Sequence, residues 1–229
     1  MTYYRERFLK RDKNFVWRGR VHECISPQGK IVKSEFTVVH LPDDTGRGSR
    51  NLDIYRKWAG EEALSGRDLF YYGRELYYHR LYAEAIAVLE DMLKGEGWYV
   101  NKIEACRVLA ACRMARGETE RALDALFASF RYGEPRAGVL CDIGGIFREQ
   151  KKYREAVFFF ESAIRCRDHS IEGDFEEPAA RSLTPALELV SCYWQLGEKE
   201  AALAWHKRTE ELAPEHPSVR FNRDFFAKS

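Results

Sequence analysis

The stretch WRGRVHE, residues 17–23, holds the side chains of this sequence that are most suggestive of chemistry. His22 and Glu23 are adjacent, and histidine and carboxylate side chains are common general acids and bases. The stretch continues as HECIS, so it lacks the second histidine of a HExxH zinc-protease motif. Neighbouring residues of a strand point to opposite faces, so these two side chains cannot reach one substrate atom without a bulge or bend. By itself the stretch predicts a strand in which Trp17 and Val21 pack inward and Glu23 pairs with a nearby arginine.

The composition indicates a globular protein and excludes several functional classes. Of 229 residues, 45% are hydrophobic and 32% are charged, which is enough apolar material for a substantial core. The net charge of +1 gives no general attraction to nucleic acid or membranes. No apolar run approaches the roughly 18 residues of a membrane span, and the N-terminus has no apolar signal core. No Ser/His/Asp arrangement, P-loop or GxGxxG motif is found in the sequence.

The cysteines predict a reducing compartment. No two of the six cysteines form a CxxC pair, and most of them fall within apolar helical patterns. We interpret them as small buried side chains and expect a cytoplasmic location.

Two alternating stretches open the chain. FVWRGRVHECI and KIVKSEFTVVHL each switch between apolar and polar positions, and SPQGK between them has Pro and Gly in turn positions. The pattern predicts a β-hairpin or two neighbouring strands. The following PDDTGRGSR has no apolar periodicity, and we interpret it as a connection that ends this segment.

From residue 51 onward the sequence becomes helical and repeats itself. Four stretches, 69–93, 106–130, 140–164 and 186–214, each read as a helix, a tight turn and a second helix. Each second helix contains an alanine, and these alanines are spaced by 37, 34 and 46 residues: Ala85, Ala122, Ala156 and Ala202. Glycines fall either at a small-residue site of the first helix or at the turn: Gly73 and Gly144, then Gly117 and Gly197.

Residues 66–214 resemble the tetratricopeptide repeat family, whose period is about 34 residues. The resemblance implies a mainly α fold, a helical-repeat solenoid of about four repeats preceded by a short β-hairpin. We expect an opening helix over residues 52–65 and a capping helix over 217–226. The longest spacing indicates an acidic insert near residues 167–180, between the third and fourth repeats.

The resemblance also implies a concave groove that is lined by the first helix of each repeat. Aromatic and arginine side chains at the groove positions of that family suit an extended protein or peptide segment, or a glycan stacked on flat rings. The alternative is that the aromatic ones pack against neighbouring helices. The groove positions are Arg67, Phe70, Arg74, Tyr77, Tyr78, Arg107, Met114, Arg148, Trp194 and Gln195.

Residues 5–56 resemble the C-terminal end of a bacterial family-two glycosyltransferase catalytic domain. An Arg- and Phe-rich run precedes W-x-G-x-V-H-E and a strand that ends in His, and in bacterial members this end is often followed by tetratricopeptide repeats. The resemblance implies that Glu23 is a candidate general base on the acceptor side, which Trp17 would line. It also implies that His40, or alternatively His22, approaches the metal and pyrophosphate of a nucleotide-sugar donor.

One departure from that family affects the expected activity. The family binds its donor through an N-terminal half with an Asp-x-Asp motif, which does not precede WRGRVHE here. We therefore expect residues 1–47 to be the end of a catalytic domain and residues 48–229 to be the repeat domain. The chain alone would bind no cofactor and would be inactive, whereas the parent enzyme would use Mg or Mn and a nucleotide sugar. The repeats would position an acceptor protein or peptide or mediate self-association; the alternative is a free-standing adaptor for protein–protein interaction.

Overall fold

The computed structural model describes residues 8–25, 28–32, 36, 38–39, 48–169 and 178–228. The predicted His40 and most of the acidic insert lie outside these residues. The chain divides into two compact units, one that extends to Trp98 and one that begins at Tyr99. The domain boundary predicted between residues 47 and 48 stays a prediction.

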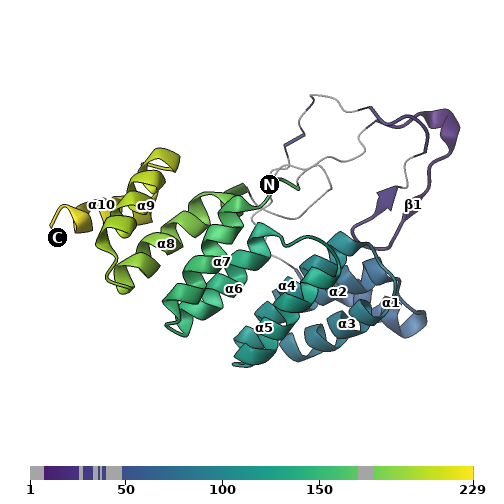
Figure 1. Ribbon diagram of the computed structural model, residues 1–229. Coiled ribbons are helices and arrows are strands. Elements are labelled where there is room, and N and C mark those ends of the chain that lie inside the picture. The colour runs from purple at the N-terminus through teal and green to yellow at the C-terminus, as the bar shows by residue number, and fades with distance from the viewer. Residues whose placement is uncertain are drawn as a thin grey trace. The chain divides into compact units, whose positions relative to one another are not determined.

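In its described residues, the first unit contains a short 3-10 helix, a small hairpin and three α-helices (Figure 1). Helix α2 packs against both α1 and α3. The predicted opening helix is confirmed as α1, which begins two residues earlier than expected and ends at Glu61. The elements are η1 (Arg11–Lys13), β1 (Trp17–Arg18), β2 (Cys24–Ile25), α1 (Arg50–Glu61), α2 (Gly66–Tyr78) and α3 (Tyr82–Lys94).

The described hairpin lies within the first of the two alternating stretches. β1 pairs antiparallel with β2, with Trp17 opposite Ile25, so the chain reverses at residues 19–23. The start of the predicted turn, residues 26–27, and much of the predicted second strand lie outside the described residues. Gly19 and His22 have φ values of 93° and 52°, and these left-handed conformations produce the reversal. The expected inward packing is correct for Val21, which is 7% exposed, and wrong for Trp17, which is 60% exposed.

The second unit consists of helix pairs that follow one another along the chain (Figure 1). Pairs α4–α5, α6–α7 and α8–α9 pack internally, α7 also packs against α8, and α10 packs against α9. The predicted helical repeats and the capping helix are confirmed. The elements are α4 (Tyr99–Ala115), α5 (Thr119–Ala128), η2 (Ser129–Arg131), α6 (Ala137–Glu149), α7 (Tyr153–Arg165), η4 (Pro178–Arg181), α8 (Leu183–Gln195), α9 (Lys199–Leu212) and α10 (Pro217–Phe226).

Small residues allow the paired helices to approach closely, as the repeat pattern predicts. The four alanines that define the repeats are all fully buried. A Cβ added at Gly73 in α2 would lie 2.5 Å from Cδ2 of Leu89 in α3. A Cβ added at Gly144 in α6 would lie 2.9 Å from the Phe160 ring of α7. Glycine is therefore required at both positions by helix packing, because interiors have no room for an added methyl group.

The turn between the two helices of a repeat has the same conformation in all four. Gly117 and Gly197 have φ values of 75° and 77°, and Arg80 and Lys151, at the equivalent positions, both have 60°. In each turn the next residue donates its N–H to a carbonyl five residues earlier, as from Lys152 to Phe147 at 2.9 Å. This is the hydrogen bond of a Schellman motif, and it holds non-glycine residues in a left-handed conformation that costs them energy.

Replacing Lys151 with glycine is therefore expected to stabilise the protein by about 0.5–1 kcal/mol, because the relief of left-handed strain exceeds the entropy that glycine adds to the unfolded chain. Urea denaturation at neutral pH measures the change. Lys152→Gly is the matched control, since Lys152 has φ −86° and should lose stability. A Lys151→Gly variant that is no more stable than the Lys152→Gly variant contradicts this account of the turn.

Aromatic side chains attach the capping helix α10 to the last repeat. The rings of Phe225 and Phe226 lie 4.9 and 5.7 Å from that of Trp194 in α8. The ring of His206 in α9 stacks on Phe226 at 5.1 Å and is 3% exposed. Burial lowers the pKa of His206, Glu210 raises it and Arg223 lowers it, with a net decrease.

Acidification is therefore expected to weaken the last repeat through His206. Because the pKa is lower in the folded than in the unfolded protein, the stability that neutral His206 contributes is present above pH 6.5 and is lost as the pH falls below it. Measured between pH 7.5 and 5.5, the free energy of unfolding should fall less steeply for His206→Phe, which does not titrate. Equal slopes for the two proteins would show that His206 is not buried in its neutral form.

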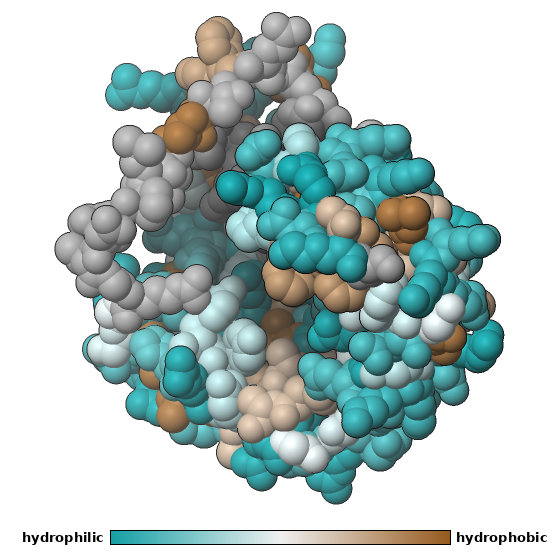
Figure 2. All heavy atoms as spheres, turned by 90° about the vertical axis from the view of Figure 1, so that its left-hand side faces the viewer, coloured by the Kyte–Doolittle hydropathy of each residue, from teal (hydrophilic) through white to brown (hydrophobic). Residues whose placement is uncertain are grey.

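The surface of the helices is mainly polar. Figure 2 shows hydrophilic side chains over most of the face in view, with apolar residues in smaller groups between them. Two phenylalanines of the second unit are nevertheless well exposed, Phe158 at 60% and Phe221 at 69%. Within the described part of the chain, no helix combines the length and apolar character that crossing a membrane requires.

Candidate functional site

The five residues between β1 and β2, residues 19–23, form a loop that lies on α1 and α2. We call residues 20–22 the docking loop and the surface of α1 and α2 that they contact the docking face. Three consecutive side chains, Arg20, Val21 and His22, each contact a different part of this face. WRGRVHE therefore contributes a contact surface whose parts can be described one at a time.

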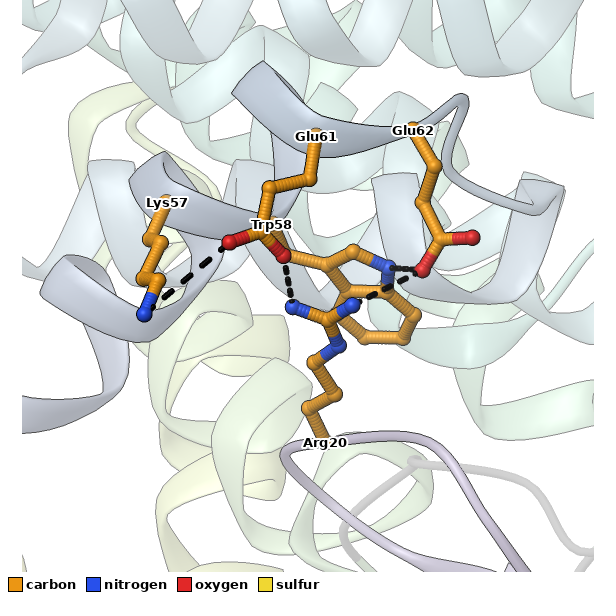
Figure 3. Close-up of polar contacts among 5 residues, drawn as sticks. All are labelled: Arg20, Lys57, Trp58, Glu61 and Glu62. Carbon is orange, nitrogen blue, oxygen red and sulfur yellow. Dashed lines mark hydrogen bonds and ion pairs between the residues drawn. The ribbon is translucent and has the colours of Figure 1, made fainter.

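Arg20 is held by two carboxylates and an indole ring (Figure 3). Its guanidinium nitrogens lie 2.5 Å from Glu61 and 3.0 Å from Glu62, and its Cζ lies 5.2 Å from the centre of the Trp58 ring. Trp58 Nε1 donates to the same Glu62 oxygen at 2.6 Å, and Lys57 lies 3.9 Å from Glu61. The hydrogen bond from Arg20 lowers the pKa of Glu61, so both side chains are charged at neutral pH. The site is an acidic clamp with an aromatic floor.

Val21 occupies an apolar pocket beside the clamp. It packs with Tyr55 and Trp58, and Ile54, Leu64, Tyr71 and Tyr72 surround them. The Tyr55 ring is fully buried and stacks with that of Tyr72 at 5.4 Å. Burial raises the pKa of Tyr55, which stays neutral. Val21 is the one aliphatic side chain of the docking loop, and its burial adds hydrophobic stabilisation to the polar contacts of Arg20 and His22.

His22 lies on an aromatic ring beside a buried carboxylate. Its ring stacks on Tyr71 at 4.4 Å, and its Nε2 lies 3.4 Å from Glu75. Asn51 donates to the same Glu75 oxygen at 3.3 Å, and the contact with His22 is the main reason that the pKa of Glu75 is lowered. Arg67 donates to the carbonyl oxygen of His22 at 2.5 Å. The face therefore contacts both the side chain and the backbone of this residue.

The catalytic and metal roles expected from the glycosyltransferase resemblance stay predictions. Trp17 and Glu23 are exposed at either end of the loop, and His40 lies outside the described residues. His22 approaches Glu75, but two side chains do not make a metal site. In the parts of the chain that the structure describes, no three His, Cys, Asp or Glu side chains are placed to hold a metal ion.

The groove residues predicted in the first repeat form part of the same region of α2. Arg67 contacts the docking loop, whereas Phe70 is fully buried and belongs to the core, which corrects its assignment to a groove. Arg74 lies 5.4 Å from the Phe70 ring and donates to the Tyr78 hydroxyl at 2.7 Å. Tyr77 lies against Tyr78, with ring centres 5.7 Å apart. Arg74, Tyr77 and Tyr78 thus contact one another, and their predicted role in a groove stays a prediction.

The predicted groove arginines of the later repeats connect successive first helices. Arg107 of α4 donates to Asp142 of α6 at 2.7 Å. Arg148 of α6 lies 2.7 Å from Glu188 of α8. Burial raises the pKa of Glu188, and the positive charge of Arg148 counteracts this effect. These ion pairs hold successive repeats together, so the two arginines have a structural role besides their predicted role in binding a groove ligand.

The remaining groove positions differ in exposure. Met114 is half-buried and Gln195 is exposed. Trp194 packs against the capping helix, which is the alternative that the sequence left open for the aromatic residues.

Sequence reasoning did not identify the residues that receive the docking loop. The sequence predicts an opening helix over residues 52–65 but no binding role for it, and its Trp58, Glu61 and Glu62 form the clamp. The spacing of three residues places Trp58 and Glu61 on one side of α1, and Glu62 follows directly where the helix ends, so an aromatic residue followed by two adjacent acids is the available signal. An aromatic residue with two acids at that spacing is suited to an arginine from elsewhere in the chain.

Comparisons with solved structures identify the fold. The chain is similar to YrrB, a TPR protein with an unusual peptide-binding site. The two are 15% identical, the match covers 77% of this chain and 83% of that chain, and the TM-score is 0.57. It is also similar to TTC0263, a thermophilic TPR protein of Thermus thermophilus, with 17% identity over 75% of this chain and 86% of that chain and a TM-score of 0.53.

PilF of Pseudomonas aeruginosa is similar at 16% identity over 77% of this chain and 72% of that chain, with a TM-score of 0.55. No protein-family model and no curated protein matches the sequence. The chain therefore has the tetratricopeptide repeat fold, as its sequence predicts.

Proposed function

We propose that this chain is a protein-interaction domain of the tetratricopeptide type whose docking face binds a polypeptide loop. The observation that carries the proposal is the set of contacts that residues 20–22 make with the docking face. Arg20 binds in the acidic clamp, Val21 packs in the apolar pocket, and His22 stacks on an aromatic ring beside a carboxylate. Helical repeats bind other chains through surfaces of this kind, since paired helices expose rows of side chains but carry no chemistry of their own.

The contact is suited to reversible binding. Burial of a valine side chain contributes about 1.5–3 kcal/mol, and a half-exposed ion pair contributes about 0–1 kcal/mol. A two-stranded hairpin by itself is marginally stable in water. The hairpin of residues 17–25 therefore depends on the docking face for much of its stability, and its release costs only a few interactions.

The glycosyltransferase origin of residues 1–47 stays a prediction, and with it the nucleotide sugar, the divalent metal and the catalytic role of Glu23. If it is correct, the repeats would position an acceptor protein or mediate self-association. If it is not, the chain is an adaptor. Binding of a polypeptide by the repeat domain is common to both, and the six free cysteines suit the predicted cytoplasmic location.

The test supplies the loop from outside. The probe is a fluorescein-labelled cyclic peptide of residues 16–25 with Cys24→Ser, and the receptor is the full chain with Arg20→Ala and Val21→Ser, so that its own loop cannot dock. Fluorescence anisotropy should show saturable binding of the probe. Adding Glu61→Lys and Glu62→Lys to the receptor should weaken binding at least about tenfold, because the clamp then repels arginine.

A charge exchange provides the matched control. A probe with Arg20→Glu should not bind the first receptor but should regain binding to the receptor with the two lysines. Circular dichroism of both receptors confirms that the helices are intact. The proposal fails if the probe does not bind the first receptor, or if it binds equally well after the carboxylates are reversed.

A further inference from the structure

The docking face is covered by the chain's own loop, so any partner that uses this face has to replace that loop. The contacts of residues 20–22 with the face are two half-exposed carboxylates and the Trp58 ring around Arg20, and one apolar pocket around Val21. Around His22 they are one ring, one carboxylate and the hydrogen bond from Arg67 to its carbonyl oxygen. Regulation by this loop requires exchange between a docked and a released state, and only the released state leaves the face free.

The loop is connected to the helices that bind it by a long stretch of chain. β2 ends at Ile25 and α1 begins at Arg50. A connection of this length keeps the released loop near its site at an effective concentration on the order of millimolar. The released loop therefore competes with any partner for the face. To displace it, a partner must exceed the effective concentration of the loop multiplied by the ratio of the partner's dissociation constant to that of the loop.

We propose that residues 20–22 are an intramolecular competitor for a partner protein that presents a loop with arginine, an aliphatic residue and histidine in this order. This proposal rests on the proposed function, because it specifies the ligand of the same face and its regulation. The docked loop occupies each part of the face with one side chain, so it indicates the chemistry that the face accepts.

Each part of the face restricts a partner residue in a different way. The first must be arginine and not lysine, because a planar guanidinium contacts two carboxylates and covers the Trp58 ring at once. The second must be a small aliphatic residue that fits among Tyr55, Trp58 and the residues around them. The third must stack on Tyr71 and give a hydrogen bond to Glu75, which favours histidine.

The backbone supplies a further restriction. His22 has a φ of 52°, and its carbonyl oxygen accepts the hydrogen bond from Arg67. A partner therefore has to present this sequence in a turn, since an extended strand would direct that carbonyl elsewhere. A cyclic peptide should accordingly bind more tightly than a linear peptide of the same sequence, because less conformational entropy is lost on binding.

The experiment compares the unaltered chain with the chain whose loop is disabled, with the cyclic peptide of residues 16–25 as the probe. The disabled chain (Arg20→Ala, Val21→Ser) should bind the probe at least about tenfold more tightly than the unaltered chain, because the competitor has been removed. A second disabled chain, with Val21→Asp alone, should bind the probe as tightly. It shows that the increase comes from release of the loop and not from the particular substitutions in the first disabled chain. Arg20→Lys in the probe should weaken binding to either disabled chain by about tenfold.

The outcomes separate this proposal from the proposed function. Equal affinity of the probe for the unaltered and the disabled chains would overturn the competitor role, although the face would still be a binding site. An Arg20→Lys probe that binds as tightly as the original would overturn the proposed specificity. Absence of binding to both disabled chains, with intact helices, would overturn the proposed function together with this inference.

Discussion

Replacing Phe160 with alanine is expected to lower the free energy of unfolding by about 3–5 kcal/mol. The ring is 1% exposed and packs with Ala156, Leu189 and Cys192, so it joins α7 to α8. Its removal leaves a cavity in the core between consecutive repeats that the fixed helices cannot close. Urea denaturation followed by circular dichroism measures the loss. A loss below about 1 kcal/mol would mean that the helices rearrange freely around this position.

Two adjacent glycines of α6 provide the controls. Gly144→Ala should cost about 1–3 kcal/mol, because its Cβ would meet the Phe160 ring. Gly145→Ala should instead gain about 0.5–1 kcal/mol, since a Cβ there meets no described atom within 4 Å and alanine favours the helix. In the Phe160→Ala background, Gly144→Ala should cost nothing further, because the space is already vacant. Costs of Gly144→Ala and Phe160→Ala that simply add would contradict the proposed steric contact.

The repeat architecture could be predicted because many independent local signals agree. A buried alanine in each second helix and a left-handed turn residue recur in all four repeats, and a glycine where helices cross recurs in the first and third. Ala85 and Ala156 are fully buried, and Gly144 has no room for a side chain. Agreement between local preference and global packing is what makes such a pattern readable from one sequence.

The hairpin and its docking face could not be predicted in the same way. Alternating polarity indicated longer strands, but Val21 is buried by Tyr55 and Trp58, which are distant in the sequence. Nothing local specifies that contact, and the reversal of the chain depends on the left-handed conformations of Gly19 and His22. Glycine and histidine adopt left-handed conformations more readily than most residues, but the Pro and Gly of SPQGK are a stronger turn signal, and the turn was therefore predicted there.

The groove residues illustrate a related difficulty. Repeat position indicated that Arg107 and Arg148 belong to first helices, which is correct. It did not indicate that Asp142 and Glu188 are placed to pair with them from the neighbouring repeats. An arginine on such a surface can bind a ligand, a neighbouring repeat or both, and the choice depends on acids that lie about one repeat further along the chain.

Replacing Arg107 with glutamine is expected to cost about 1–3 kcal/mol, between the values for exposed and fully buried ion pairs. Its guanidinium donates to Asp142 at 2.7 Å and to Glu104 at 3.2 Å, and it covers Gly138, where an added Cβ would lie 2.9 Å from Cζ. Burial lowers the pKa of Arg107, but the two carboxylates raise it by more, so the charge is retained. Glutamine keeps much of the stem but removes the positive charge that both carboxylates contact.

A double-mutant cycle with Asp142→Asn separates the ion pair from other effects. The two substitutions together should cost less than the sum of the single ones, because the first removes the interaction that the second would lose. Arg74→Gln is a comparison on a first helix of the other unit, where the guanidinium contacts the Tyr78 hydroxyl and aromatic rings. If Arg107→Gln and Asp142→Asn are additive and nearly without effect, Arg107 does not hold α4 to α6, and the predicted role of its side chain in binding a groove ligand becomes the better explanation of its presence.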